Sequence, residues 1–137
     1  MLKGSCLCGG VRYEVDGPFE LMAHCHCVQC RKASGADFAT NASVSVGDFK
    51  LVAGEELLAR YESSPGNQRI FCRRCGSPIM KRVDDKPEKV RLRLGSLEGD
   101  PGIRPALHVF TSERPSWSEI RDELPQFEKA PAPPKDC

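Results

Sequence analysis

Long hydrophobic runs are absent from this sequence. No stretch of apolar residues exceeds three, as at 57–59, whereas a membrane-spanning helix needs about 20. An excess of charge of one sign is also lacking, because 20 basic residues face 19 acidic ones and leave a formal net charge of +1. This balance argues against nucleic acid and against an anionic membrane as partners.

Helical patterning is scarce too, and no internal repeat is present. Alternation of apolar and polar residues predicts strands at 11–15 and 89–94, and shorter strand candidates lie at 57–61, 68–71 and 78–83. Turn-forming residues separate them at 16–18, 64–67 and 99–102. The sequence therefore predicts one small, mostly β domain over 1–130 and a mobile Pro-rich tail over 131–137.

The only helical candidates are a turn at 28–33 and a short helix at 116–121, where Ser116 is a candidate N-cap. In the predicted strand at 89–94, the polar residues Arg91 and Arg93 are expected to lie on a solvent-exposed face. Trp117 and Phe127 are expected to anchor the C-terminal segment to the core.

The abundant feature is cysteine, with eight residues. Seven form three clips: Cys6 and Cys8; Cys25, Cys27 and Cys30; Cys72 and Cys75. The eighth, Cys137, stands alone in the Pro-rich tail. The N-terminal sequence lacks the apolar core of a signal peptide, so we expect a cytoplasmic protein whose clustered cysteines bind metal instead of forming disulfides.

Ligand counting divides the clips into two sites. A structural zinc takes four protein ligands, while a catalytic zinc keeps one position open. The two pairs make a closed set of Cys6, Cys8, Cys72 and Cys75, and the bends this needs are permitted by Gly9-Gly10 and Gly76. Iron–sulfur ligation or free thiols are the alternatives for this set.

The remaining triple of Cys25, Cys27 and Cys30 supplies three ligands. One interpretation is an open catalytic zinc. A second is another structural zinc, closed by His24, His26, His108 or Cys137, and a third is an empty or redox-active thiol cluster. Away from that role, the histidines are expected to be packed or exposed neutral side chains.

An open zinc with three thiolates favours chemistry on a thiol. The site has a formal charge of −1, which makes it a weaker Lewis acid than zinc on three neutral histidines and less suited to activating water. A soft thiolate suits the fourth position, and a thiol bound there ionises near neutral pH.

The three clips in this order identify a family. The segments 4–11, 25–32 and 71–78, with the endings 108–110, 115–117 and 124–127, resemble the glutathione-dependent formaldehyde-activating enzyme family, whose domain also occurs in centromere protein V. The resemblance covers nearly the whole chain, to about residue 131.

This resemblance implies several small twisted antiparallel sheets in a β-tent-like arrangement, stapled by zinc. It implies two zinc ions: a structural one on Cys6, Cys8, Cys72 and Cys75, and a catalytic one on Cys25, Cys27 and Cys30. The implied reaction joins glutathione and formaldehyde into S-(hydroxymethyl)glutathione, a carbon–sulfur lyase reaction when reversed. Arg31 and Lys32, beside the triple, are candidates to bind a glutathione carboxylate.

Two other classes of function compete with an enzyme. The chain could be a zinc-stabilised module that binds protein or nucleic acid, or a thiol- or metal-sensing protein that uses the triple as a labile clip. The intact triple favours the enzyme, because a scaffold needs only the four-cysteine site.

Overall fold

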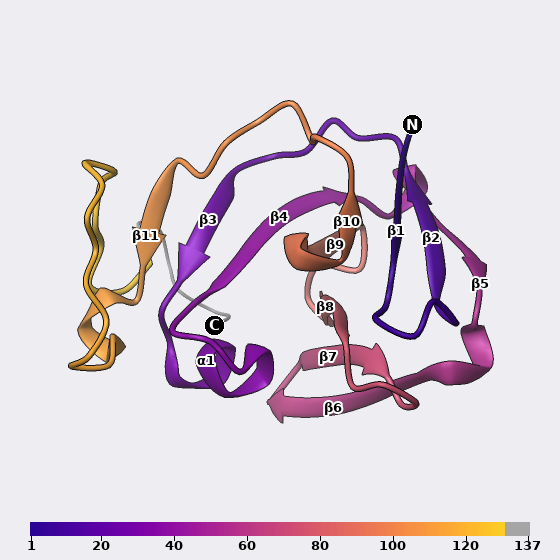
Figure 1. Cartoon of the computed structure of the whole chain (residues 1–137), viewed down its shortest axis with the longest axis horizontal. Coiled ribbons are helices and arrows are strands. Elements are labelled where there is room, and N and C mark those ends of the chain that lie inside the picture. Colours follow the sequence, from indigo (N-terminus) through magenta and orange to yellow (C-terminus); the bar gives the residue numbers. More distant parts are fainter. Residues whose placement is uncertain (131–137) are drawn as a thin grey trace.

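The computed structural model describes residues 1–130, whose strands form two sheets (Figure 1). The four-stranded sheet has the order β10-β1-β2-β5, and the seven-stranded sheet has the order β11-β3-β4-β9-β8-β7-β6. The mostly β fold with little helix is thus confirmed. The predictions about the tail at 131–137 and about Cys137 lie outside the described residues.

Most of the strands are short. They are β1 (Leu2–Ser5), β2 (Arg12–Val15), β3 (Met22–Cys25), β4 (Ala39–Ser45), β5 (Phe49–Ala53), β6 (Leu58–Ser64), β7 (Asn67–Cys72), β8 (Pro78–Val83), β9 (Lys89–Arg93), β10 (Leu97–Glu98) and β11 (Leu107–Val109). The helical elements are α1 (Val28–Ser34) and the 3₁₀ turns η1 (Val46–Asp48), η2 (Glu55–Leu57), η3 (Leu94–Ser96) and η4 (Thr111–Glu113). In this part of the chain, no helix is both long and apolar enough to cross a membrane.

The sequence located five of these strands. The prediction at 78–83 coincides with β8, and the others overlap β2, β6, β7 and β9. The alternation in β2 is reflected in burial, since Val11, Tyr13 and Val15 are all almost inaccessible to solvent. The predictions missed β3 and β4, which lie on either side of the correctly expected helix α1.

One strand pair departs from the expected antiparallel arrangement. β11 runs parallel to β3, and this pairing sets His108 opposite His24 and Val109 opposite Cys25. The other pairs of named strands are antiparallel. A segment more than 80 residues downstream therefore lies beside the strand that leads into the cysteine triple.

The main core lies between the two sheets. Its buried members come from both: Val11, Tyr13 and Val15 from the N-terminal sheet, and Val44, Ile70, Ile79, Met80, Val90 and Leu92 from the larger sheet. Each such side chain contributes on the order of 1.5–3 kcal/mol by burial. Cys6 and Cys72 belong to the same cluster, so the four-cysteine site is part of the core.

The predicted helix at 116–121 is wrong. The segment forms a single turn, in which the Ser118 N–H donates to the Pro115 carbonyl at 3.1 Å. The Ser118 hydroxyl donates to Asp37 Oδ2 at 2.7 Å, and the Arg114 side chain donates to the Ser118 carbonyl oxygen. These side-chain hydrogen bonds involve the polar groups of Ser118, and they take the place of the backbone hydrogen bonds that a helix would form.

The expected aromatic anchors behave differently from each other. Trp117 is 72% exposed and does not anchor the C-terminal segment, so that prediction is wrong. Phe127 is half-buried, and its N–H donates to the His108 carbonyl at 2.9 Å. Backbone bonding to β11 therefore holds the segment in place.

Candidate metal centres and the pocket between them

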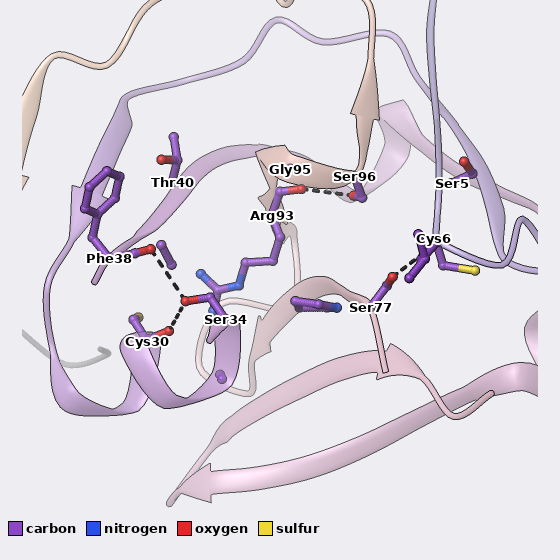
Figure 2. A pocket seen from close by; sticks show the side chains of 14 residues that line it. Ser5, Cys6, Cys30, Ser34, Phe38, Thr40, Ser77, Arg93, Gly95 and Ser96 are labelled. Atoms are coloured by element: carbon purple, nitrogen blue, oxygen red, sulfur yellow. Dashed lines mark hydrogen bonds between the residues drawn. The ribbon is translucent and has the colours of Figure 1, made fainter. Parts of the chain in front are cut away.

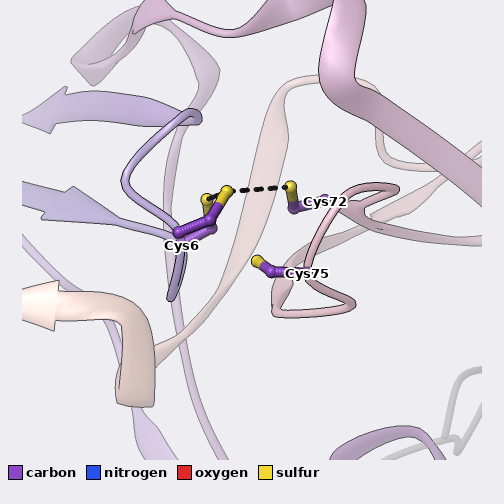
Figure 3. A group of neighbouring side chains, drawn as sticks. Cys6, Cys72 and Cys75 are labelled. Carbon is purple, nitrogen blue, oxygen red and sulfur yellow. Dashed lines mark hydrogen bonds between the residues drawn. The ribbon is translucent and has the colours of Figure 1, made fainter.

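Four cysteines from two distant turns converge at the edge of the core (Figure 3). Cys6 and Cys8 lie in the turn between β1 and β2, Cys72 ends β7, and Cys75 lies in the turn before β8. Their sulfur atoms all lie within 4.8 Å of one another. The Cys6 and Cys8 sulfurs are 3.5 Å apart, and those of Cys8 and Cys72 are 3.9 Å apart.

These distances suit one tetrahedral zinc ion. With Zn–S bonds of about 2.3 Å, tetrahedral geometry separates the sulfurs by about 3.8 Å. The local backbone also has the expected form: Gly76 has a φ of 79°, and its N–H closes the turn by donating to the Cys72 carbonyl at 2.7 Å. The Cys6 sulfur accepts from the Val11 N–H at 3.2 Å.

Local hydrogen bonds favour the thiolate form of Cys75. Hydrogen bonding with the Ser77 hydroxyl, followed by bonding to backbone N–H groups, lowers the pKa of the Cys75 thiol to about 5. Since zinc binds thiolate and not thiol, this shift favours metal binding at neutral pH.

The other three clustered cysteines surround the start of α1. Cys25 ends β3, Cys27 is the N-cap of α1 and Cys30 lies in its first turn. Their sulfurs also lie within 4.8 Å of one another, and all three side chains are at most 5% exposed. The Cys27 sulfur accepts the Cys30 N–H at 3.2 Å, so this residue caps the helix. Cys27 is disulfide-bonded in the structure, contrary to the sequence expectation, and it would hold metal in its reduced form.

No histidine belongs to this group within residues 1–130. Closure of the site by His24, His26 or His108 is therefore not what the structure shows. Closure by Cys137 lies outside the described residues.

Two buried arginines lie beside the triple. Both terminal nitrogens of Arg69 lie 3.9 Å from the Cys30 sulfur. Hydrogen bonding with Cys25, followed by the charges of Arg93 and Arg69, lowers the pKa of the Cys30 thiol to about 5. The bond to Cys30, together with burial, raises the pKa of Cys25. When one of these two thiols ionises, the negative charge therefore lies on the Cys30 sulfur, beside Arg69 and Arg93.

The expected solvation of Arg93 is wrong, because its side chain is only 8% exposed. Its alternation partner Arg91 is half-buried. Alternation correctly placed these two side chains on the polar face of β9, away from its apolar face. That polar face is nevertheless covered by other parts of the protein. The signal available in the sequence was the density of cations along β7, β8 and β9.

A pocket of about 540 Å³ extends between the two cysteine clusters (Figure 2). Cys30 lines it near α1, and Cys6 lines it near the four-cysteine site. Its other lining residues are Ser5, Leu7, Ala33, Ser34, Phe38, Ala39, Thr40, Ser77, Pro78, Arg93, Gly95 and Ser96. Small-molecule sites have volumes of about 300–1,000 Å³, so a ligand of peptide size can reach the triple.

The candidates Arg31 and Lys32 lie on α1 away from this pocket. Arg31 is half-buried, and Lys32 is exposed. Lys32 instead lines a smaller pocket of about 350 Å³, together with Arg69. Their binding of a carboxylate stays a prediction.

A chain of hydrogen bonds, which sequence reasoning missed, runs from the buried His26 and His108 to the exposed Asp122. His26 Nε2 and His108 Nδ1 are 2.8 Å apart, and His108 Nε2 lies 3.0 Å from both carboxylate oxygens of Asp122. Burial, helped by the neighbouring histidines, lowers the pKa of His26 to about 4. His26 is therefore a packed neutral side chain at pH 7. The parallel pairing of β11 with β3 creates the contact between His26 and His108, and no local sequence pattern predicts it.

Comparison with known proteins gives one consistent result. The family model described as "Glutathione-dependent formaldehyde-activating enzyme" matches residues 1–113. A Halomonas elongata protein, provisionally named as a glutathione-dependent formaldehyde-activating enzyme, is 34% identical over 88% of this chain and 81% of its own length. A Schizosaccharomyces pombe protein named as an uncharacterized lyase is 29% identical over 91% of this chain and 89% of its own.

A solved structure shares the fold as well. The crystal structure of a Rhodobacter sphaeroides protein aligns with a TM-score of 0.60 at 30% identity, covering 75% of this chain and 91% of that one. Residues 1–113, which the family model matches, include both cysteine clusters and the residues that line the pocket between them. The chain therefore belongs to the glutathione-dependent formaldehyde-activating enzyme family.

Proposed function

We propose that this protein is a zinc-dependent enzyme of carbon–sulfur lyase type that acts on the adduct of a small thiol with an aldehyde. Membership of the family favours S-(hydroxymethyl)glutathione, formed from glutathione and formaldehyde. The observation that carries the proposal is the position of Cys30, which belongs to a buried cysteine triple and also lines a pocket of about 540 Å³.

The two clusters suit different tasks. Cys6, Cys8, Cys72 and Cys75 provide the four ligands of a structural zinc, whereas Cys25, Cys27 and Cys30 provide three. The sulfur of a substrate would supply the fourth. Zinc bound there would supply the positive charge that keeps a substrate sulfur ionised at neutral pH.

The protein's own residues prepare the site for an anionic sulfur. Three thiolates on Zn²⁺ leave a formal charge of −1, which opposes the approach of another thiolate. Arg69 contacts Cys30, and Arg93 acts electrostatically on the same sulfur. Their positive charges offset the excess negative charge in a buried setting, where solvent screening is weak.

The reaction then requires little rearrangement. The substrate sulfur forms a bond to the carbonyl carbon of formaldehyde, the C=O π electrons move to oxygen, and that oxygen takes up a proton from solvent. The reverse reaction breaks the C–S bond and returns the proton. Phe38 and Ala39 form apolar parts of the pocket wall, and holding the two reactants together there raises their effective concentration.

The test follows the exchange of ¹³C-formaldehyde with its glutathione adduct by NMR. This exchange also occurs without protein, so the measured quantity is the increase in rate over the protein-free sample. We expect the zinc-loaded protein to increase the rate and Cys30→Ser to abolish the increase. Lys50→Met, which changes an exposed side chain of β5 in the other sheet, serves as the control and should leave the increase unchanged.

Zinc content provides a second readout. The protein should bind two zinc ions per chain, and Cys30→Ser should bind one while remaining folded. Zinc-loaded protein that neither increases the exchange rate nor binds glutathione by calorimetry would refute the proposed function.

A further inference from the structure

One row of the seven-stranded sheet concentrates positive charge, and Arg69 of this row contacts Gln29 and Cys30 of α1. Across β6, β7, β8, β9 and β4 the directly opposed residues are Tyr61, Arg69, Lys81, Arg91 and Ser43. Directly opposed residues share one face of a sheet. Three of these five are cations and none is acidic, and Lys81 is only 2% exposed.

Arg93 extends this cationic face toward the pocket. It lies two residues after Arg91 on β9, on the same face, and opposite Asn41 of β4. One terminal nitrogen, Nη1, donates to Asn41 Oδ1. This bond fixes the plane of the guanidinium group.

The second terminal nitrogen of Arg93 is not used by the protein. Among residues 1–130, no atom accepts a hydrogen bond from Nη2, although the side chain is 92% buried. Leaving such a buried donor without an acceptor is unfavourable. Arg93 nevertheless lines the 540 Å³ pocket together with Cys30 (Figure 2), so a ligand there lies beside the side chain that carries this unsatisfied donor.

We propose that Arg93 is the anchor for a carboxylate of the thiol substrate, which fixes substrate specificity to anionic thiols. This inference rests on the proposed function, because it assigns the substrate's sulfur to the side of the pocket formed by Cys30. Arg93 would donate through Nη2 to the carboxylate while Asn41 holds the guanidinium in place. Arg69, Lys81 and Arg91 add the positive field that stabilises the bound anion.

The hydroxyl groups of the pocket select against a purely apolar ligand. Ser34 already donates to the Cys30 carbonyl at 2.6 Å, and Ser96 donates to the Arg93 carbonyl at 3.0 Å. Their oxygens can still accept hydrogen bonds, for example from the amide N–H groups of a peptide. A short peptide with a thiol and a carboxylate matches this arrangement of donors and acceptors.

Calorimetric titration of the zinc-loaded protein tests the proposal with four ligands. Glutathione carries both the thiol and its carboxylates, and glutathione diethyl ester lacks free carboxylates. 2-Mercaptoethanol is a thiol without carboxylate, and S-methylglutathione has the carboxylates without a free thiol. We expect glutathione to bind about 10- to 100-fold more tightly than its diethyl ester, as one charge-assisted hydrogen bond allows.

Arg93→Met should remove that difference. Glutathione and S-methylglutathione should each bind about 10- to 100-fold more weakly to this variant, while the diethyl ester and 2-mercaptoethanol bind as they do to the unmodified protein. Arg93→Lys, which keeps the charge, should recover part of the loss. Arg60→Met, an exposed arginine on β6, is the matched control and should change nothing.

Equal affinity of the unmodified protein for glutathione and for its diethyl ester would overturn the proposal, and this comparison decides even if Arg93→Met fails to fold. An equal loss of all four ligands in Arg93→Met would overturn it too. By contrast, Arg93-dependent binding of S-methylglutathione with no binding of 2-mercaptoethanol, and no gain from the free thiol of glutathione, would support Arg93 as the anchor and refute the proposed function.

Discussion

The two cysteine clusters should contribute unequally to stability, because they close loops of different length. A metal shared by Cys8 and Cys72 links residues 64 positions apart, whereas one shared by Cys25 and Cys30 links residues five apart. In the chain-entropy treatment of a cross-link, these loops are worth about 4.3 and about 2.1 kcal/mol. The four-cysteine site should therefore stabilise the fold by about 2 kcal/mol more.

Two conservative substitutions isolate this difference. Cys75→Ser removes a half-buried ligand that is already hydrogen-bonded to Ser77, so little packing is lost. Cys27→Ser replaces the N-cap of α1 by one of the best N-cap residues, so the helix keeps its cap. In reduced protein, where Cys27 is not held in a disulfide, the cost of each substitution then comes mainly from its metal site.

Thermal unfolding followed by circular dichroism, with zinc content measured on the same samples, provides the assay. A difference of about 2 kcal/mol corresponds to a midpoint about 8 °C lower for Cys75→Ser than for Cys27→Ser, at about 4 °C per kcal/mol for a domain of this size. Loss of activity with a nearly unchanged midpoint is expected for Cys27→Ser. If Cys27→Ser lowers the midpoint as much as Cys75→Ser, the triple is structural and the assignment of the two sites is wrong.

Two further predictions concern the core and its turns. Gly54→Ala should destabilise the protein by about 3 kcal/mol or more, because the residue has a φ of 87° and a new Cβ would lie 2.3 Å from a backbone oxygen. The control, Gly35→Ala, changes a glycine with a φ of 67° in open space and should cost only about 1 kcal/mol. Equal losses of stability in urea unfolding would contradict this reasoning. Burial raises the pKa of Tyr13 to about 12 from the ordinary value of 10, so the unfolded chain releases this proton first and the free energy of unfolding should fall between pH 10 and pH 12. Tyr13→Phe should show a shallower fall over that range, and identical slopes for the two proteins would show that Tyr13 does not contribute.

The sequence predicted the cysteine groups well because ligand counting depends only on residue type and spacing. Three clips of two, three and two residues admit few divisions into tetrahedral sites. The positive φ of Gly76 followed from the same reasoning, since the turn after the second cysteine requires it. The spacing could not show which side chains lie beside each site, because those come from strands far away in the chain.

Arg93 and His108 illustrate that limit. Alternation in β9 indicates correctly that Arg93 lies on the face away from the core, but alternation cannot show whether another element covers that face. Here α1, about 60 residues earlier, brings Cys30 toward the arginine. His108 lies between Leu107 and Val109 in an ordinary short strand, and only its parallel pairing with β3 brings it to His26. The failed helix at 116–121 has a related cause, because its serine bonds to an aspartate 81 positions away.

The cationic row of the seven-stranded sheet also has a kinetic consequence. The formal net charge of the chain is only +1, so at distances well beyond the screening length of about 8 Å at physiological ionic strength an approaching anion experiences almost no attraction. Within that distance, Arg69, Lys81 and Arg91, with neighbouring Arg93, add positive charge beside the pocket. Capture of an anionic ligand should then depend on the final few ångströms of approach, so salt should change its dissociation rate more than its association rate.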